Sequence, residues 1–310
     1  GGTKNFFSLS AHSRLMISAR ILNSSEHKTG FTPSSRGKIS QLTLRYAKQQ
    51  GKTALTHSYF SYPWYSFPPL YLDNTGCATT FLTNPSGGFV GGDDLSLTAT
   101  LGKNTHVLLT TPSATKIYRM LEQSATQSID ITVGPNAILE WMPDLTIPFA
   151  GSRFSQSINI RMSTGATVIL WDAMAAGRVA RGERWVFSQF ANQINILGSN
   201  GSQLHERYSL LPEIGTSCLT FEQWNYSGSL LLFNDQMSTT TWENLHAELA
   251  SLFQEETHQV LAGVTETPLP GLAVKILARS APEMTMLFEK TWGLARKHLL
   301  KLDLPALRRY

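Results

Sequence analysis

At 310 residues, with 42% hydrophobic and 15% charged residues, the chain can bury a substantial core in one large or two smaller domains. No apolar run approaches the ~18 residues of a membrane-spanning helix. The two cysteines, Cys77 and Cys218, form no CxxC pair and suit a reducing compartment, so we expect a cytoplasmic protein. Because no long apolar run occurs, we expect no membrane anchor. The net charge of +4 divides into +8 over residues 1–52 and −4 over residues 53–310, which does not indicate a nucleic-acid-binding face on the folded body.

The first 38 residues are polar, basic and turn-rich, and we expect them to form a flexible N-terminal arm. Met16 would suit a natural start, so residues 1–15 are left out of the fold prediction. A nucleic-acid-binding role of residues 1–52 stays open as a hypothesis. It predicts salt-sensitive binding that is lost when this segment is removed.

From residue 39 to the C-terminus we expect a single domain that is mainly β. Period-two alternation starts at Gln41–Tyr46, and short strand patterns fill residues 94–235. Three similar segments, at 102–110, 134–141 and 165–172, place Val107, Ile138 and Ile169 at intervals of 31 residues, with a weaker echo at 201–207. A fixed period without intervening helices predicts a β-helix or solenoid-like stack of short strands. A β-sandwich of hairpins is the competing interpretation.

Two helices are predicted in the C-terminal third, near residues 241–260 and 281–303. Thr240 and Glu243 have the spacing of a capping box, and so do Ser280 and Glu283. Apolar residues follow both boxes at helical spacing, and Pro305 comes soon after the second helix. Two such amphipathic helices would cover part of the β body.

Residues 84–94 contain four glycines in six positions, interrupted only by Phe89 and Val90. Linkers are polar and poor in aromatic residues, so this stretch does not resemble one. Glycine is the default residue where the chain needs a positive φ or where another backbone passes close by. We expect a tight, partly buried double turn that fixes the position of Asp93, although an ordinary pair of turns would fit the pattern as well.

Several catalytic and metal-binding signatures are missing, among them GxxxxGK[ST], HExxH and GxSxG. What remains is a set of acids in apolar or glycine-rich settings: Asp93, Glu140, Asp144, Asp172, Glu183 and Glu206. A carboxylate in such a place must be paired, hydrogen-bonded or in contact with water. The acids could therefore form buried pairs with nearby arginines, or they could line a wet internal channel. A third interpretation is a carbohydrate-active enzyme that uses Asp144, Asp172 or Glu183 as paired acids.

Four motifs give a specific resemblance. They are Pro-Ser-Gly-Gly-Phe-Val-Gly-Gly-Asp at 85–93, Thr-Thr-Pro-Ser-Ala-Thr-Lys-Ile-Tyr-Arg at 110–119, Leu-Glu-Trp-Met-Pro-Asp-Leu-Thr-Ile-Pro-Phe at 139–149 and Trp-Asp-Ala-Met-Ala-Ala-Gly-Arg-x-Ala-Arg-Gly-Glu at 171–183. In these residues the chain resembles urease accessory proteins of the UreD family, called UreH in some bacteria. The similarity runs from about residue 40 to 235 and weakens through the helices.

The resemblance implies a non-enzymatic chaperone of urease maturation. Members of the family bind apo-urease, and a UreF-type partner docks on them and recruits the UreG-type GTPase that carries nickel. The implied fold is a mostly β, helix-like stack with two α-helices, and Ni²⁺ is thought to pass through an internal tunnel lined by acids and hydroxyls.

By motif, the nickel path would fall on Asp93, Thr115 and Asp172, and with a weaker match on Glu183 and Glu206. The family often has a Cys-His pair and a further His before the glycine motif, where this chain has Ala78, Thr79 and Asn84. The missing imidazoles leave the carboxylate route intact. Carboxylates, hydroxyls and waters suit Ni²⁺ in transit, because a conduit must release the ion that it binds, so we expect no tightly bound cofactor.

Overall fold

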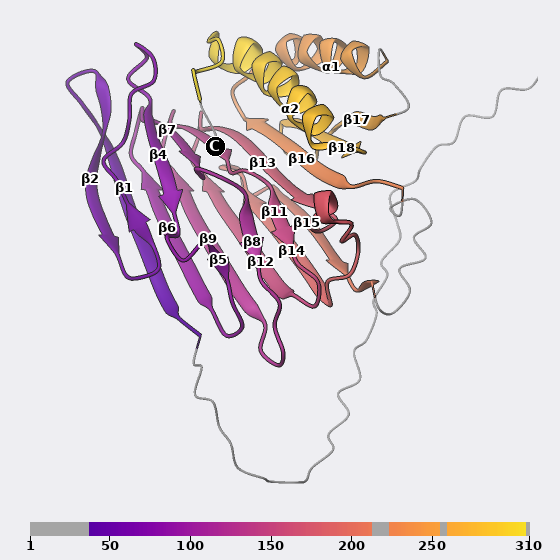
Figure 1. Ribbon diagram of the computed structural model, residues 1–310. Coiled ribbons are helices and arrows are strands. Elements are labelled where there is room, and N and C mark those ends of the chain that lie inside the picture. The colour runs from indigo at the N-terminus through magenta and orange to yellow at the C-terminus, as the bar shows by residue number, and fades with distance from the viewer. Residues whose placement is uncertain (1–36, 213–222, 255–258, 308–310) are drawn as a thin grey trace, which may run out of the picture. The chain divides into compact units, whose positions relative to one another are not determined.

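The computed structural model describes residues 37–212, 223–254 and 259–307 (Figure 1). All but the last two residues of the predicted N-terminal arm lie outside this range, and so do residues 255–258 of the first predicted helix.

The repeating unit of the fold is a coil made of two longer strands joined by a short one. The first coil is β4 (Ala78–Thr83), β5 (Gly88–Phe89) and β6 (Asp94–Leu101). The second is β7 (His106–Thr110), β8 (Thr115–Ile117) and β9 (Ala125–Val133), and the third is β10 (Ile138–Met142), β11 (Thr146–Pro148) and β12 (Arg153–Met162). In the fourth, β13 (Thr167–Ala175) leads through a 3-10 turn, η1 (Val179–Arg181), to β14 (Gln189–Leu197). The mainly-β, solenoid-like prediction is confirmed.

Equivalent strands of successive coils pair in parallel. The first strands form β4-β7-β10-β13 and the last strands form β6-β9-β12-β14, while β5, β8 and β11 stack at the corner between them. Val107 pairs with Leu139, and Leu139 pairs with Val168, so the steps are 32 and 29 residues. The predicted equivalence of Val107 with Ile138 and Ile169 is therefore wrong by one residue at the first step and by two at the second. Corners of unequal length cause this difference.

Further strands extend both sheets. In the seven-stranded sheet, β1 (Ile39–Gln49) pairs in parallel with β6 and antiparallel with β2 (Lys52–Phe60), and β15 (Gln203–Leu210) forms an antiparallel hairpin with β14. The second sheet adds β3 (Tyr65–Ser66), β16 (Tyr226–Asn234), β17 (Val260–Glu266) and β18 (Gly271–Ala278). The predicted echo at 201–207 thus belongs to a hairpin and not to a further coil.

Two apolar cores hold the described body together. The larger core lies between the two sheets and takes every second side chain of the long strands, such as Leu95, Leu97 and Ala99 of β6. In the smaller core, the other face of the second sheet packs against α1 (Thr239–Gln254) and α2 (Ala281–Ala295), which cover β16–β18 (Figure 1). Among the described residues, no helix combines the length and the apolar character needed to cross a membrane.

Helix ends agree partly with the prediction. Ser280 caps α2, since its Oγ accepts a hydrogen bond from the Glu283 amide and donates one to the Glu283 carboxylate. At α1 the capping residue is Ser238, whose Oγ accepts from the Thr241 amide, and not Thr240. A π-helical turn, η3 (Arg296–Leu300), continues α2, and residue 260 already lies in β17.

Strand β18 can approach β16 closely because residue 271 is glycine. A Cβ at Gly271 would lie 1.9 Å from the Leu232 carbonyl oxygen, whereas a Cβ at Gly263 of the neighbouring β17 would meet no atom within 4 Å. We expect Gly271→Ala to lower the free energy of unfolding by about 1–3 kcal/mol, as overpacking does. Gly263→Ala is the matched control, with an expected change within about 0.5 kcal/mol. Urea unfolding curves measure both, and equal midpoints would contradict the prediction.

Candidate functional site

A cavity of about 100 Å³ lies where the corner of the coils meets the space between the sheets. All four motifs contribute to its wall: Gly87–Phe89 from the first, Thr111–Thr115 from the second, Trp141, Pro143 and Thr146 from the third, and Asp172 from the fourth. Segments separated by up to 85 positions in the sequence therefore meet at one place. Among the lining residues, Asp172 is the only one with a charged side chain.

The glycine stretch forms the wall of this cavity, as the predicted double turn requires. Gly87 has a φ of +80°, and β5 stacks on β8 through the backbone of Gly88. A Cβ at Gly88 would lie 2.2 Å from the Lys116 carbonyl oxygen, so only glycine permits this approach. The stretch is therefore a corner built for close backbone contact.

Asp93 is buried, with 1% of its surface exposed, but it does not line the cavity. One carboxylate oxygen accepts the Lys38 amide at 3.0 Å and the other accepts the Val90 amide at 2.9 Å. The side chain thus fastens the glycine corner to the segment that enters β1. Its place on a nickel path stays a prediction.

Asp172 lies at the centre of a network of amide side chains. Gln156 Nε2 donates to its Oδ1 at 3.0 Å and Asn192 Nδ2 donates to its Oδ2 at 2.6 Å. Gln156 and Asn192 are also bonded to each other, at 3.1 Å. Burial raises the pKa of Asp172 to about 6, against the opposing effect of these hydrogen bonds. The carboxylate can therefore take up and release a proton near neutral pH.

The polar side chains around Asp172 form two rows that face each other. Gln127, Gln156 and Asn192 occupy one register position on β9, β12 and β14. On the opposite sheet, Asp172, Ser229 and Lys275 are paired neighbours on β13, β16 and β18. Both rows lie on the inner faces of their sheets, within a mainly apolar core. We call these polar side chains, which extend from the cavity toward the β15–β18 side, the polar route.

The remaining predicted site residues divide between this route and the surface. Thr115 lines the cavity together with Asp172. Glu206 of β15 lies at the other end of the route, where Ser229 Oγ donates to it at 3.0 Å. Glu183 lies apart and forms a salt bridge with Arg178, and this hydrogen bond lowers the pKa of Glu183. Glu183 is therefore paired with a nearby arginine, as one of the interpretations of the acids predicted. The pair is only partly buried.

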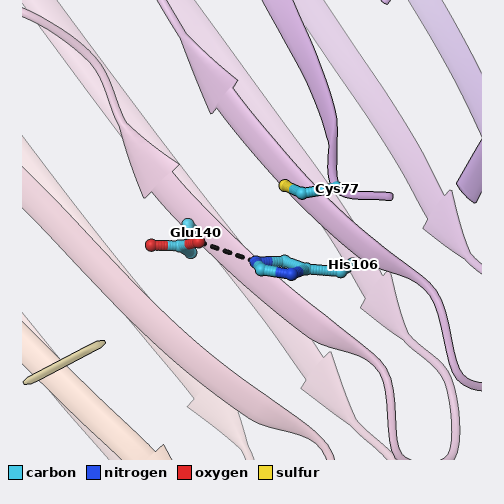
Figure 2. A group of neighbouring side chains, drawn as sticks. All are labelled: Cys77, His106 and Glu140. Atoms are coloured by element: carbon cyan, nitrogen blue, oxygen red, sulfur yellow. Dashed lines mark hydrogen bonds and ion pairs between the residues drawn. The ribbon is translucent and has the colours of Figure 1, made fainter. Parts of the chain in front are cut away.

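A second cluster joins the outer face of the second sheet to α2. The Cys77 thiol, the His106 ring and the Glu140 carboxylate lie within 4.8 Å of one another, and all three residues are buried (Figure 2). His106 Nε2 lies 2.7 Å from Glu140 Oε1, as the dashed line in Figure 2 marks. Sulfur, nitrogen and oxygen ligands at this spacing could in principle surround a metal ion.

The donors around Glu140 favour a structural role for this cluster. Trp292 Nε1 donates to Glu140 Oε2 at 2.7 Å, and Arg296 Nη1 lies 2.7 Å from one carboxylate oxygen and 3.0 Å from the other. A metal ion would have to displace a buried guanidinium. Burial, assisted by the Glu140 charge, also raises the pKa of the Cys77 thiol, which stays protonated and is a poor ligand. We therefore assign these residues to fixing α2 on the sheet.

Sequence reasoning missed Gln156, Asn192 and Lys275, because uncharged amides and single lysines carry no motif. The alternation of the strands could have pointed to the amides, because each amide takes a position where the alternation places an inward-facing apolar residue. An example is Gln156 in Phe154-Ser155-Gln156-Ser157-Ile158. The Glu140 cluster has a similar signal, since Trp292 and Arg296 are four residues apart on one helical face.

Asp93→Ala should destabilise the glycine corner, because the amides of Lys38 and Val90 lose their acceptor. We expect the free energy of unfolding to fall by about 2 kcal/mol or more. The control is Asp94→Ala, which removes an exposed carboxylate bonded to the Thr126 hydroxyl and should cost within about 0.5 kcal/mol. Denaturant titration of both variants checks the difference, and an Asp93→Ala protein as stable as Asp94→Ala would refute the anchoring role.

Comparison with known proteins agrees with the four motifs. Residues 38–309 match the family described as UreD urease accessory protein. The protein named urease accessory protein UreD from Acaryochloris marina is 32% identical over 258 residues, covering 83% of this chain and 89% of the relative. The corresponding Bacillus cereus protein is 27% identical with 78% and 88% covered, and UreD 2 of Streptomyces griseus is 30% identical with 89% and 96% covered.

These relatives carry the name of an accessory protein and not of an enzyme, in agreement with the non-enzymatic prediction. The carbohydrate-active interpretation finds no such support, and its candidates Asp172 and Glu183 are engaged by amides and by Arg178. The family match over most of the chain, and the meeting of its four motifs at one cavity, show that this chain belongs to the UreD family of urease accessory proteins, which supports a role in urease maturation.

Proposed function

We propose that this protein is a nickel-insertion chaperone that gives Ni²⁺ a passage from the motif-lined cavity, past Asp172, to the Glu206 side of the body. The observation that carries the proposal is the convergence of the four motifs on a cavity with one charged residue, Asp172. The polar route continues from this carboxylate through Asn192 and Ser229, which lie in a mainly apolar core. Buried polar rows are costly, so a function that needs them is a physical reason for their presence.

The ligands along this route suit an ion that must leave again. Carboxylate, amide and hydroxyl oxygens bind Ni²⁺ more weakly than imidazole and thiolate do, and several weak sites in sequence permit passage. Within the described residues, the indole N–H groups of Trp64 and Trp141 are buried at the cavity and have no acceptor. Water molecules in the cavity that are not bound to the ion would supply such acceptors.

Protonation of the Asp172 carboxylate would release a bound nickel ion. With a pKa raised to about 6 by burial, the carboxylate is close enough to neutrality that proton and metal compete for it. The charges of Glu206 and Lys275 act on Asp172 as well, whereas burial raises the pKa of the neighbouring Tyr208 and keeps that side chain neutral.

The partners in this proposal are the urease structural subunits, a UreF-type accessory protein that docks on this chain, and a UreG-type GTPase that reaches it through UreF. The proposed setting is the cytoplasm. A pull-down with urease subunits and with the UreF-type protein tests the scaffold part of the proposal. Failure to capture either one would remove it.

Asp172→Ala should lower the nickel content and the activity of urease severalfold without preventing complex formation. The matched control is Asp130→Ala, which removes a carboxylate of β9 that is bonded to Asn159 and points away from the cavity side. Nickel content is measured by metal analysis of urease activated in the presence of each variant. Full activation by Asp172→Ala would exclude this residue from the nickel path.

Nickel binding to the purified protein should depend on pH through Asp172. Because one proton competes with the ion, the apparent affinity should fall about tenfold per pH unit below the pKa of about 6 and level off above it. In Asp172→Asn this step should disappear. Calorimetric titrations between about pH 5 and 7, one unit on either side of the shifted pKa, check this. An unchanged pH profile in the variant would assign the titration to another group.

A further inference from the structure

The Glu206 end of the polar route carries a positive charge. Lys275 of β18 forms a salt bridge with Glu206, and its Nζ also donates to Ser229 Oγ at 2.8 Å. The Ser229 hydroxyl donates in turn to Glu206 Oε1 at 3.0 Å, so the three side chains form a closed hydrogen-bonded group. The Lys275 side chain is 53% exposed and the Glu206 side chain is 20% exposed, which places the group where the route meets solvent.

This group is continuous with Asp172. Ser229 pairs with Asp172 on one side and with Lys275 on the other, so the three side chains stand in one row on the same face of the sheet. The charges of Glu206 and Lys275 both act on Asp172, one raising its pKa and the other lowering it. A cation that leaves Asp172 in this direction therefore meets the ammonium group before it reaches solvent.

We propose that Lys275 is the counter-ion that keeps the Glu206 end of the route closed to divalent cations. This inference rests on the proposed nickel passage. With the ammonium in place, Glu206 is neutralised and offers no net charge to a metal ion. When the ammonium moves away, Glu206 and Ser229 become a second oxygen site next to Asp172, and the ion can advance by one step.

Electrostatics sets the size of the effect. Repulsion between an ammonium group and a divalent cation ~6 Å apart corresponds to a factor of about ten in affinity even at the dielectric constant of water, and to more in a partly buried site. A lysine suits this task, because its ammonium is a point charge on a flexible stem and can swing aside. An arginine would bind the carboxylate with a planar fork and would release it less readily.

The test uses Lys275→Met, which keeps the length of the stem and removes the charge. We expect it to bind Ni²⁺ at least about tenfold more tightly than the unmodified protein in calorimetric titration at pH 7.5. Adding Glu206→Gln to this variant should abolish the gain, and Lys275→Arg, which keeps the positive charge, should show no gain. The matched control is Lys297→Met, which breaks the exposed pair with Glu248 on the helices and should leave binding unchanged.

Glu206→Gln alone tests the same pair from the other side. It leaves an uncompensated ammonium facing Asp172, and Ni²⁺ affinity should fall below that of the unmodified protein. The far-ultraviolet circular dichroism of each variant confirms that it is folded.

The outcomes separate the two proposals. If Lys275→Met binds no better than Lys297→Met while Asp172→Asn still weakens binding, the counter-ion role is wrong and the nickel passage stands. If neither Asp172→Asn nor Lys275→Met alters binding, the passage and its counter-ion are both wrong.

Discussion

The parallel stacking of successive coils is the constraint on which the rest of the structure depends. In a parallel pair, residues at one register position lie next to each other, and every second side chain points into the core. Any residue that recurs at an inward position therefore becomes part of a continuous row. Leucine and isoleucine produce an apolar core in this way, and Gln127, Gln156 and Asn192 produce a polar row from the same geometry. A polar row within the core needs no separate architecture, only a different residue at one position of each coil.

The polar row is stable because its members satisfy one another. Asp172 accepts hydrogen bonds from both Gln156 and Asn192, which spread its charge over two amides without neutralising it. In the Glu140 cluster the negative charge is neutralised instead, because the Arg296 guanidinium forms a salt bridge with the Glu140 carboxylate. The two acids thus differ in kind. Glu140 is saturated by donors and serves the fold, whereas Asp172 lines a cavity and accepts hydrogen bonds from neutral amides.

Much of the fold could be predicted from the sequence, because its signals are local. Period-two alternation predicted the strands, the regularly spaced glycine turns predicted the coils, and the capping box at Ser280 predicted the start of α2. The register could not be predicted, since the corners between β7, β10 and β13 have unequal lengths and hydrophobic residues occupy both faces of these strands. Among the candidate site residues, the motifs supplied Thr115 and Asp172, which share the cavity. Lys275 lies on an antiparallel strand outside the motifs, so only the folded chain brings it next to Ser229.

The salt bridge between Glu140 and Arg296 also affects how the chain folds while it is being synthesised. The two residues are 156 positions apart, so a ribosome that adds about 5–20 residues per second needs roughly 8–30 s between them. During this interval the outer face of the second sheet, with Leu108, Met142 and Ile169, lacks α2 to cover it, and Glu140 lacks its cationic partner Arg296. The nascent chain therefore exposes an apolar surface around a buried acid until its last fifth is synthesised. Early contact with another protein would protect this surface, and the rate of translation over the final helix would affect the yield of folded protein.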